Sequence, residues 1–232
     1  MREGEIKPTE NYLNLIAKIM KENYDFVREK ADETYTEVIE LINDAIDYLA
    51  AEIQKGKSKD DYVKDPMLFF IVHILMPQSY AIHTDLLMGN LPACFMELRL
   101  MLEAMVKCYF ASLHPDKNLF FELKIISLED WLSKQNISTS KFLEEIGKEI
   151  GVKRELVALW GKLSRDWIHP RGIVERIVNK VVEKADVPPW ALAIPMNYTE
   201  NDLDDINELR KRVSQFRRLL RIVVEKYKTK NS

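Results

Sequence analysis

The sequence predicts an all-α fold, a single up-and-down-like bundle of about eight to ten helices. Apolar residues recur at helical spacing along most of the 232 residues. Turn residues are scarce, with seven glycines and nine prolines placed mostly between the periodic segments, which argues against a sandwich or barrel. With 47% hydrophobic and 31% charged residues, the chain can bury a sizeable core.

Composition narrows the classes of function. The net charge of -3 provides no overall attraction to nucleic acid or to an anionic membrane. The longest apolar stretch, Met67–Pro77, is interrupted by His73 and is too short to cross a bilayer, and the N-terminus has no apolar signal segment. Cys94 and Cys108 lie on one predicted helix about 21 Å apart and cannot bond each other. We therefore expect a cytoplasmic protein without a membrane segment, and the scarce glutamine beside abundant Lys and Glu is typical of thermophiles.

The first predicted unit is an N-terminal helical hairpin. Helical periodicity covers residues 9–30 and 32–55, and the polar stretch 56–61 is predicted to be a loop. We expect this hairpin to pack on a helical bundle formed by the rest of the chain. The hairpin, residues 1–60, and the bundle, residues 61–232, are expected to form one structural unit.

Capping signals predict where the later helices begin and end. Asp65 followed by Pro66 is typical of a helix start, and Pro77 is expected to end or kink that helix. The next helix should end at Gly89, and Pro92 should open a central helix. Further helices are predicted over 92–113, 116–134, 138–150, 153–169, 173–187 and from Thr199 or Asn201 to about Lys228, with an irregular Pro-rich segment near 187–198.

The predicted central helix, residues 92–113, is apolar on nearly every side, as expected for a buried helix. Arg99, Glu103 and Lys107 step by four residues and so form one narrow charged seam. One interpretation is a ladder of ion pairs facing a solvent-filled gap. The other is that Arg99 and Glu103 face inward and hold a polar site, because buried charge persists only when it is paired or used.

A second polar group lies at the end of the helix predicted over 153–169. Arg165 and His169 are four residues apart and share a face, with Asp166 beside them. An imidazole next to a fixed cation can move a proton and stabilise an anion, the two tasks needed to cleave a phosphodiester without metal. The structural alternative is a histidine interacting with the dipole and free carbonyls of its helix end.

The run Leu87-Met-Gly-Asn-Leu-Pro-Ala-Cys-Phe-Met-Glu-Leu-Arg-Leu-Met-Leu-Glu-Ala-Met-Val-Lys-Cys-Tyr109 and the run Leu163-Ser-Arg-Asp-Trp-Ile-His-Pro170 resemble a loose group of uncharacterised prokaryotic helical domains. This group is similar in style to HEPN domains, helical modules of toxin, antiviral and RNA-processing systems. The resemblance covers roughly residues 78–170. It implies a homodimer and, in ribonuclease members, a catalytic arginine and histidine, for which Arg165 and His169 have the matching residue types. Three residues separate them here, where the family has four to six.

No metal or cofactor is expected. His73, His83 and His114 lack metal-ligand spacing, and the sequence contains no Gly-rich phosphate loop, nucleophile elbow or CxxC motif. These three histidines are most simply structural.

The C-terminal helix is strongly basic. Residues 209–232 contain nine basic residues and one acid, and a basic stripe lies beside the apolar one. This stripe can track nucleic-acid phosphates, or it can pack against the acidic second helix. The stripe consists of Arg210, Arg217, Arg221 and Lys228, and the candidate acids are Asp32, Glu33, Glu37, Glu40, Asp44 and Asp47.

Two functions follow from these patterns. The preferred one is a non-catalytic, dimeric binding or regulatory module of a prokaryotic defence or stress system, with RNA or protein as its partner. In it, Arg99, Glu103 and Asp166 organise the fold or an RNA-facing groove. The alternative is a metal-independent ribonuclease in which His169 is the general acid and base and Arg165 holds the phosphate.

Overall fold

The structure is a computed structural model that describes residues 8–168 and 196–231. Within those residues it contains helices and turns but no strand, which confirms the all-α prediction. The helix predicted over 173–187 and most of the Pro-rich segment lie outside the described residues. In chain order the elements are α1 (Pro8–Lys30), α2 (Asp32–Gln54), α3 (Lys59–Tyr62), α4 (Pro66–Phe70), the π turn η1 (Ile71–Leu75), α5 (Met76–Leu87), α6 (Leu91–Ser112), α7 (Phe121–Lys134), α8 (Thr139–Ile150), α9 (Lys153–Leu163), the π turn η2 (Ser164–Ile168), the 3-10 turn η4 (Glu200–Asp202) and α11 (Leu203–Asn231).

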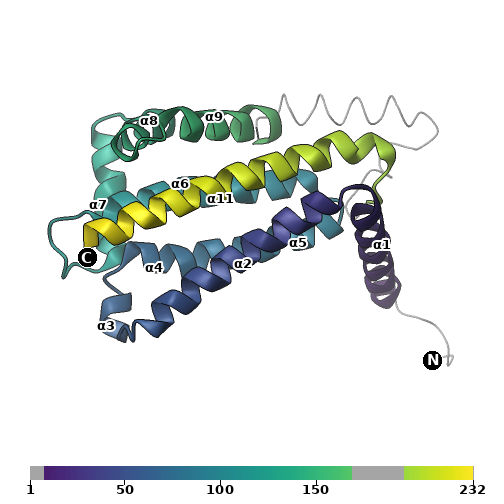
Figure 1. Ribbon diagram of the computed structural model, residues 1–232, viewed down its shortest axis with the longest axis horizontal. Coiled ribbons are helices and arrows are strands. Elements are labelled where there is room, and N and C mark those ends of the chain that lie inside the picture. The colour runs from purple at the N-terminus through teal and green to yellow at the C-terminus, as the bar shows by residue number, and fades with distance from the viewer. Residues whose placement is uncertain (1–7, 169–195, 232) are drawn as a thin grey trace.

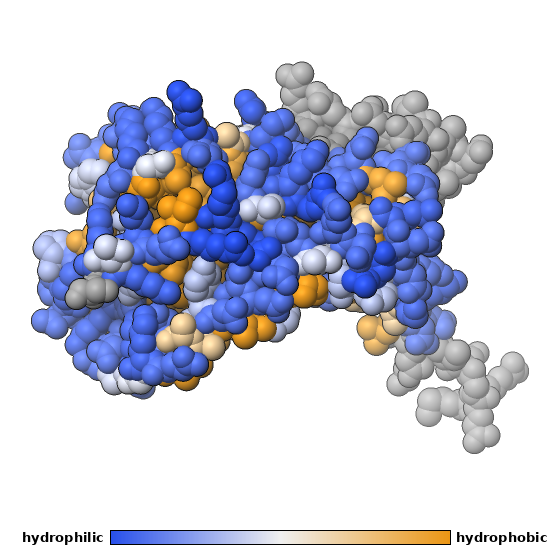
Figure 2. All heavy atoms as spheres, viewed as in Figure 1, coloured by the Kyte–Doolittle hydropathy of each residue, from blue (hydrophilic) through white to orange (hydrophobic). Residues whose placement is uncertain are grey.

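The C-terminal helix α11 runs through the middle of the bundle. It packs on α6 and lies between α8 and α9 on one side and α2 on the other (Figure 1). The α2 helix also packs on α5, so it is part of the main bundle. Figure 2 shows apolar side chains gathered in the hollow between α8 and α11, with hydrophilic residues around them. Lys230 at the end of α11 pairs with Glu149 of α8 and lies over the ring of Tyr109.

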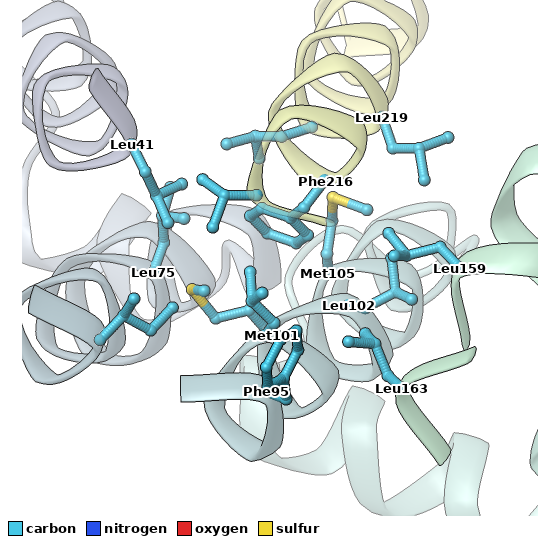
Figure 3. Packing of buried hydrophobic residues seen from close by; sticks show 14 of the residues in the cluster. Leu41, Leu75, Phe95, Met101, Leu102, Met105, Leu159, Leu163, Phe216 and Leu219 are labelled. Atoms are coloured by element: carbon cyan, nitrogen blue, oxygen red, sulfur yellow. The ribbon is translucent and has the colours of Figure 1, made fainter. Parts of the chain in front are cut away.

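The core is built on α6. Its residues Leu98, Met101, Leu102 and Met105 are fully buried, and Figure 3 shows the last three among side chains from α2, α9, α11 and η1. The helix is not enclosed on every side as its composition suggests, because Met96 and Leu100 on the opposite side are half exposed. The opposite strip of α6 is therefore open to solvent.

Of the two outcomes predicted at Pro77, an end of the preceding helix is wrong, and the chain instead departs from regular α-helix in the turn before it. From Pro66 to Leu87 the chain forms one continuous helix, in which the π turn η1 ends two residues before Pro77. Wider i→i+5 hydrogen bonds in η1 shift the bonding register, and this shift accommodates a residue that has no backbone N–H. The same helix is 22 residues long and apolar enough to cross a membrane by length and composition alone. Core helices of soluble proteins can have the same length and apolar composition, and this helix packs against α2 and α6.

Local hydrogen bonds explain the predicted helix starts that are confirmed. Asp65 accepts the backbone N–H groups of Met67 and Leu68 and caps α4, with Pro66 in the first position. Ser138 caps α8 in the same way, and Gly151 ends α8 with φ +84°. The N-cap side chains each satisfy donors that the first helical turn leaves free.

Two segments differ from the prediction because side chains impose another local structure. In the predicted loop, Ser58 and Asp61 form a reciprocal capping box that starts the short helix α3. The helix predicted from residue 116 begins only at Phe121, because His114 accepts the N–H of Asp116 and the Asp116 carboxylate accepts that of Asn118. These bonds form a turn in place of helix.

Helix α1 contacts the bundle through its second half. Ile19, Asn23 and Val27 are buried, and Figure 1 shows α1 extending away from the bundle toward the N-terminus. The side-chain amide of Asn23 donates to the carbonyl oxygens of Leu87 and Met196, at 2.8 and 2.9 Å. Asn23 therefore joins α1, the end of α5 and the chain that enters α11.

Replacement of Gly89 should be much more destabilising than replacement of Gly56. Both have positive φ, at +72° and +65°, but a Cβ at Gly89 would lie 2.0 Å from the Met196 carbonyl oxygen, whereas nothing lies within 4 Å at Gly56. We expect Gly89→Ala to cost about 3 kcal/mol and Gly56→Ala about 1 kcal/mol, the latter from backbone strain alone. Urea unfolding of both variants measures the difference, and equal losses would contradict the close approach at Gly89.

Candidate functional site

The Arg99 and Glu103 side chains form the centre of a compact polar cluster on α6. The Arg99 Nε donates to a Glu103 carboxylate oxygen at 2.7 Å, and the Trp160 indole N–H of α9 donates to the same oxygen at 2.7 Å. The Arg99 guanidinium also lies 5.4 Å from the centre of the Trp160 ring. Both charged side chains are about three-quarters buried. The Arg99–Glu103 ion pair therefore lies within α6, is largely buried, and is tied to α9 by the Trp160 indole N–H.

Lys107, the third residue of the predicted seam, contacts α7 rather than α9. Lys107 forms an ion pair with Glu129 of α7 at 2.9 Å. Together, the seam residues bind α6 to α9 at one end and to α7 at the other. This is the arrangement expected of polar residues that organise a helical fold.

The second predicted group lies on the π turn η2, which replaces the last turn of the helix predicted to reach His169. Arg165 is exposed, and Asp166 forms an ion pair with Lys162 at 3.4 Å. His169 lies outside the described residues, so its position relative to Arg165 is not part of the structure described here. Glu103 is bonded to Arg99 and Trp160, and no ion pair joins it to Arg165 within the described chain.

Trp167 fixes the position of η2. Its ring stacks on Phe95 of α6 with 3.6 Å between ring centres, and both side chains are buried. Because Arg165 is exposed while Trp167 is buried against Phe95, the turn holds the arginine at the surface above a packed aromatic pair. π turns of this kind are frequent at functional sites.

A pair of carboxyl groups that the sequence analysis did not single out joins α5 to α6. Asp85 accepts a hydrogen bond at 2.7 Å from the Asn90 amide, in the turn between the two helices. Glu97 interacts with Asp85 and has one carboxylate oxygen that is buried with no hydrogen-bond partner. Asp85 lies four residues before Gly89 and Glu97 lies eight residues after it, so the spacing in the sequence did not pair them.

Burial raises the pKa of the Glu97 carboxyl to about 8, and the negative charge of Asp85 acts in the same direction. At neutral pH Glu97 therefore holds its proton beside an acidic neighbour. A carboxyl group that titrates near neutral pH can act as an acid or base, and it also makes stability depend on pH.

Most of the basic stripe on α11 is bound to α2. The Arg217 side chain is 9% exposed and contacts Asp44 at 2.6 Å, Glu37 at 2.8 Å and Glu40 at 3.3 Å. Arg221 also reaches Asp44, at 3.3 Å. These contacts match the alternative in which the basic helix packs against the acidic second helix. Two further members behave similarly, with Arg210 paired to Glu33 and Lys228 placed 5.9 Å from the Tyr48 ring.

The histidines of the described chain have separate surroundings. His73 bonds to the Tyr62 hydroxyl, and His83 packs edge-on against Tyr35, with burial lowering its pKa. Across residues 8–168 and 196–231, no three His, Cys, Asp or Glu side chains are grouped so that they could hold a metal ion. Both cysteines are free and buried.

Comparison with known proteins adds no further assignment. No protein-family model, no curated protein and no solved structure matches this chain.

The Glu97 carboxyl should make the protein less stable as pH rises. Its pKa is about 8 in the folded state, above the ordinary value of 4.5, so between these values the unfolded chain releases the proton more readily. The contribution of the Glu97 carboxyl to the free energy of unfolding is therefore fully present below about pH 4.5. It is lost as the pH rises to about 8. We expect Glu97→Gln to add about 1 to 2 kcal/mol at pH 8.5 and almost nothing at pH 4.5, measured by denaturant unfolding.

The matched control for this experiment is Glu122→Gln, at an exposed position on α7. It should change stability equally little at both pH values. A Glu97→Gln gain that is the same at pH 4.5 and pH 8.5 would contradict the assignment of a proton to Glu97.

Proposed function

We propose that this chain is a non-catalytic helical binding module, similar in style to HEPN domains, that works as a homodimer. The observation that carries the proposal is the uncovered apolar face of α1. Tyr12, Leu13 and Leu15 are 51%, 59% and 49% exposed, although they lie in a helix that otherwise packs by its apolar side.

The exposed residues continue the face that the bundle covers further along α1. At 100° per residue, Tyr12 lies within about 20° of the direction of Ile19 and Asn23, which are buried, and Leu13 and Leu15 flank that line. The same stripe is thus buried at one end of the helix and exposed at the other. A short helical segment is marginal in water unless its apolar face packs, which supports an external partner for this end.

A second copy of the chain is the occupant that fits best. Residues 11–17 contain no charged side chain, so two copies can lie against each other without repulsion. The charged residues that follow this stretch are paired along α1, Lys18 with Glu22 and Lys21 with Asp25. A two-fold axis would cover both stripes with one contact, as in most soluble homodimers.

The charged residues also support a binding role over catalysis. Glu103 accepts hydrogen bonds from Arg99 and Trp160, and Asp166 forms an ion pair with Lys162. These bonds hold α6, α9 and η2 in place. The polar residues predicted from sequence therefore serve as organisers of the module in this proposal.

The dimer should depend on the exposed end of α1. We expect Tyr12→Glu combined with Leu15→Glu to convert the dimer to a monomer at micromolar concentration, because each copy would place two charges in the apolar contact. Analytical ultracentrifugation measures the mass, and circular dichroism should show an unchanged fold because both side chains are half exposed.

The matched control is Leu123→Glu combined with Ile126→Glu on α7. These two apolar residues are as exposed as those on α1 and also lie three residues apart. The control should remain dimeric. A monomeric wild-type protein, or a dimer lost only in the α7 variant, would contradict the proposal.

One observation favours the ribonuclease as a second candidate function. Arg165 is exposed on the turn η2 and makes no ion pair within the described residues, so its guanidinium can reach a phosphate. In that function His169 would act as general acid and base.

An RNA-cleavage assay in chelator separates the two candidates. The binding module predicts that wild type, Arg165→Ala and His169→Ala leave RNA equally intact, because none of them supplies an acid and base to the phosphodiester. Cleavage by wild type that falls at least about 100-fold in His169→Ala would establish the ribonuclease and overturn the non-catalytic proposal. Intact folding of each variant is checked by circular dichroism.

A further inference from the structure

A polar pocket lies at the corner where α3 and α4 meet the ends of α6 and α11. Its volume is about 360 Å³, and five separate parts of the chain contribute to its walls. Four lysines and two aspartates are among the residues that line it, so its lining is net positive. The charged residues are Lys57, Lys64, Lys117, Lys124, Asp61 and Asp65.

Lys124 of α7 provides the buried cation of the pocket. The residue is 3% exposed, and its ammonium donates to the backbone carbonyl oxygens of Lys64 at 2.8 Å and Lys117 at 3.4 Å. No ion pair to a carboxylate is present for it within the described residues. An ammonium can donate three hydrogen bonds, so one donor remains for another acceptor. Burial of a cation with no carboxylate in direct contact is costly, and a bound anion would offset that cost.

Charges of both signs surround Lys124: Asp65 and Asp116 favour its charged form, whereas Lys117 and Lys64 oppose it. Burial lowers the pKa of the Lys124 ammonium, and the nearby charge of Lys117 lowers it further. Lys117 itself donates to the Ser112 carbonyl at the end of α6, at 2.9 Å. Lys64 pairs with Asp60, whose side chain is largely exposed. Three ammonium groups are thus gathered in one small volume.

The carboxylates of the pocket are already engaged. Asp65 caps α4 through two backbone N–H groups and accepts bonds from Lys57 and from the Tyr227 hydroxyl, both at 2.6 Å. These bonds outweigh burial and lower the pKa of Asp65. Asp61 accepts the N–H and hydroxyl of Ser58. Both acids serve the walls of the pocket, and Lys124 is the lysine with a donor left for a ligand, while Lys64 and Lys117 add positive charge beside it.

We propose that this pocket binds a small phosphomonoester through Lys64, Lys117 and Lys124. A phosphate group carries up to two negative charges and several acceptor oxygens, which match ammonium groups that approach from different directions. The volume exceeds that of a phosphate group, so the organic part of the ligand fits beside Tyr227 and Pro66. This proposal is independent of the dimer and of the ribonuclease.

Isothermal titration calorimetry of the full chain tests the proposal with three probes. Glycerol 3-phosphate and inorganic phosphate are compared with sodium chloride at matched ionic strength. We expect saturable binding of glycerol 3-phosphate, weaker binding of inorganic phosphate and none of chloride. Equal affinity for the first two would show that only the free anion is recognised and would overturn the phosphomonoester assignment.

Variants tie the binding to the pocket. Lys64→Gln combined with Lys117→Gln should weaken binding of glycerol 3-phosphate at least about tenfold, because two charge-assisted bonds are lost. Lys134→Gln, at an exposed position at the end of α7, should bind as wild type does. Lys124→Met should abolish binding, and the double variant keeps the test valid if loss of the buried lysine impairs folding. Absence of saturable binding, or a double variant within twofold of wild type, would overturn the proposal.

Discussion

Burial of α6 is the constraint on which the rest of this structure depends. Leu98, Leu102 and Met105 are fully covered by side chains from several other helices, so the surrounding helices are held in place by one shared neighbour. Charge is tolerated on such a helix only where neighbours supply partners. Glu103 meets this condition through Arg99 and the indole of Trp160. Glu97 has no such cationic partner, and its carboxyl group is instead kept neutral by a bound proton at neutral pH.

A second set of charges connects the two ends of the sequence. Arg217 of α11 is nearly buried among Asp44, Glu37 and Glu40 of α2, more than 170 residues away in the chain. Removal of one partner would leave the others as buried or crowded charges, so the contact specifies how α11 lies on α2. It also uses much of the basic charge that would otherwise be offered to a nucleic acid. The basic C-terminal helix is for this reason better explained by intramolecular packing.

The proposed sites occupy different parts of the molecule. The dimer contact lies at the free end of α1, the Arg165 turn lies against Phe95 of α6 through Trp167, and the phosphomonoester pocket lies where Lys124 and Tyr227 meet. The proposed ligand and the proposed second copy would therefore not compete for the same residues.

The sequence by itself determined the all-α class, the buried character of α6 and the helix starts at Asp65 and Ser138, because periodicity and capping are local. The sequence did not show which side chains of different helices would contact one another. Helical spacing placed Arg99 beside Glu103, but only tertiary packing decided that Trp160 completes the cluster and that Arg165 does not. The lysine pocket and the Asp85 and Glu97 pair were missed for the same reason. Each depends on side chains from different helices, whose relative positions are set by packing around α6 rather than by local sequence.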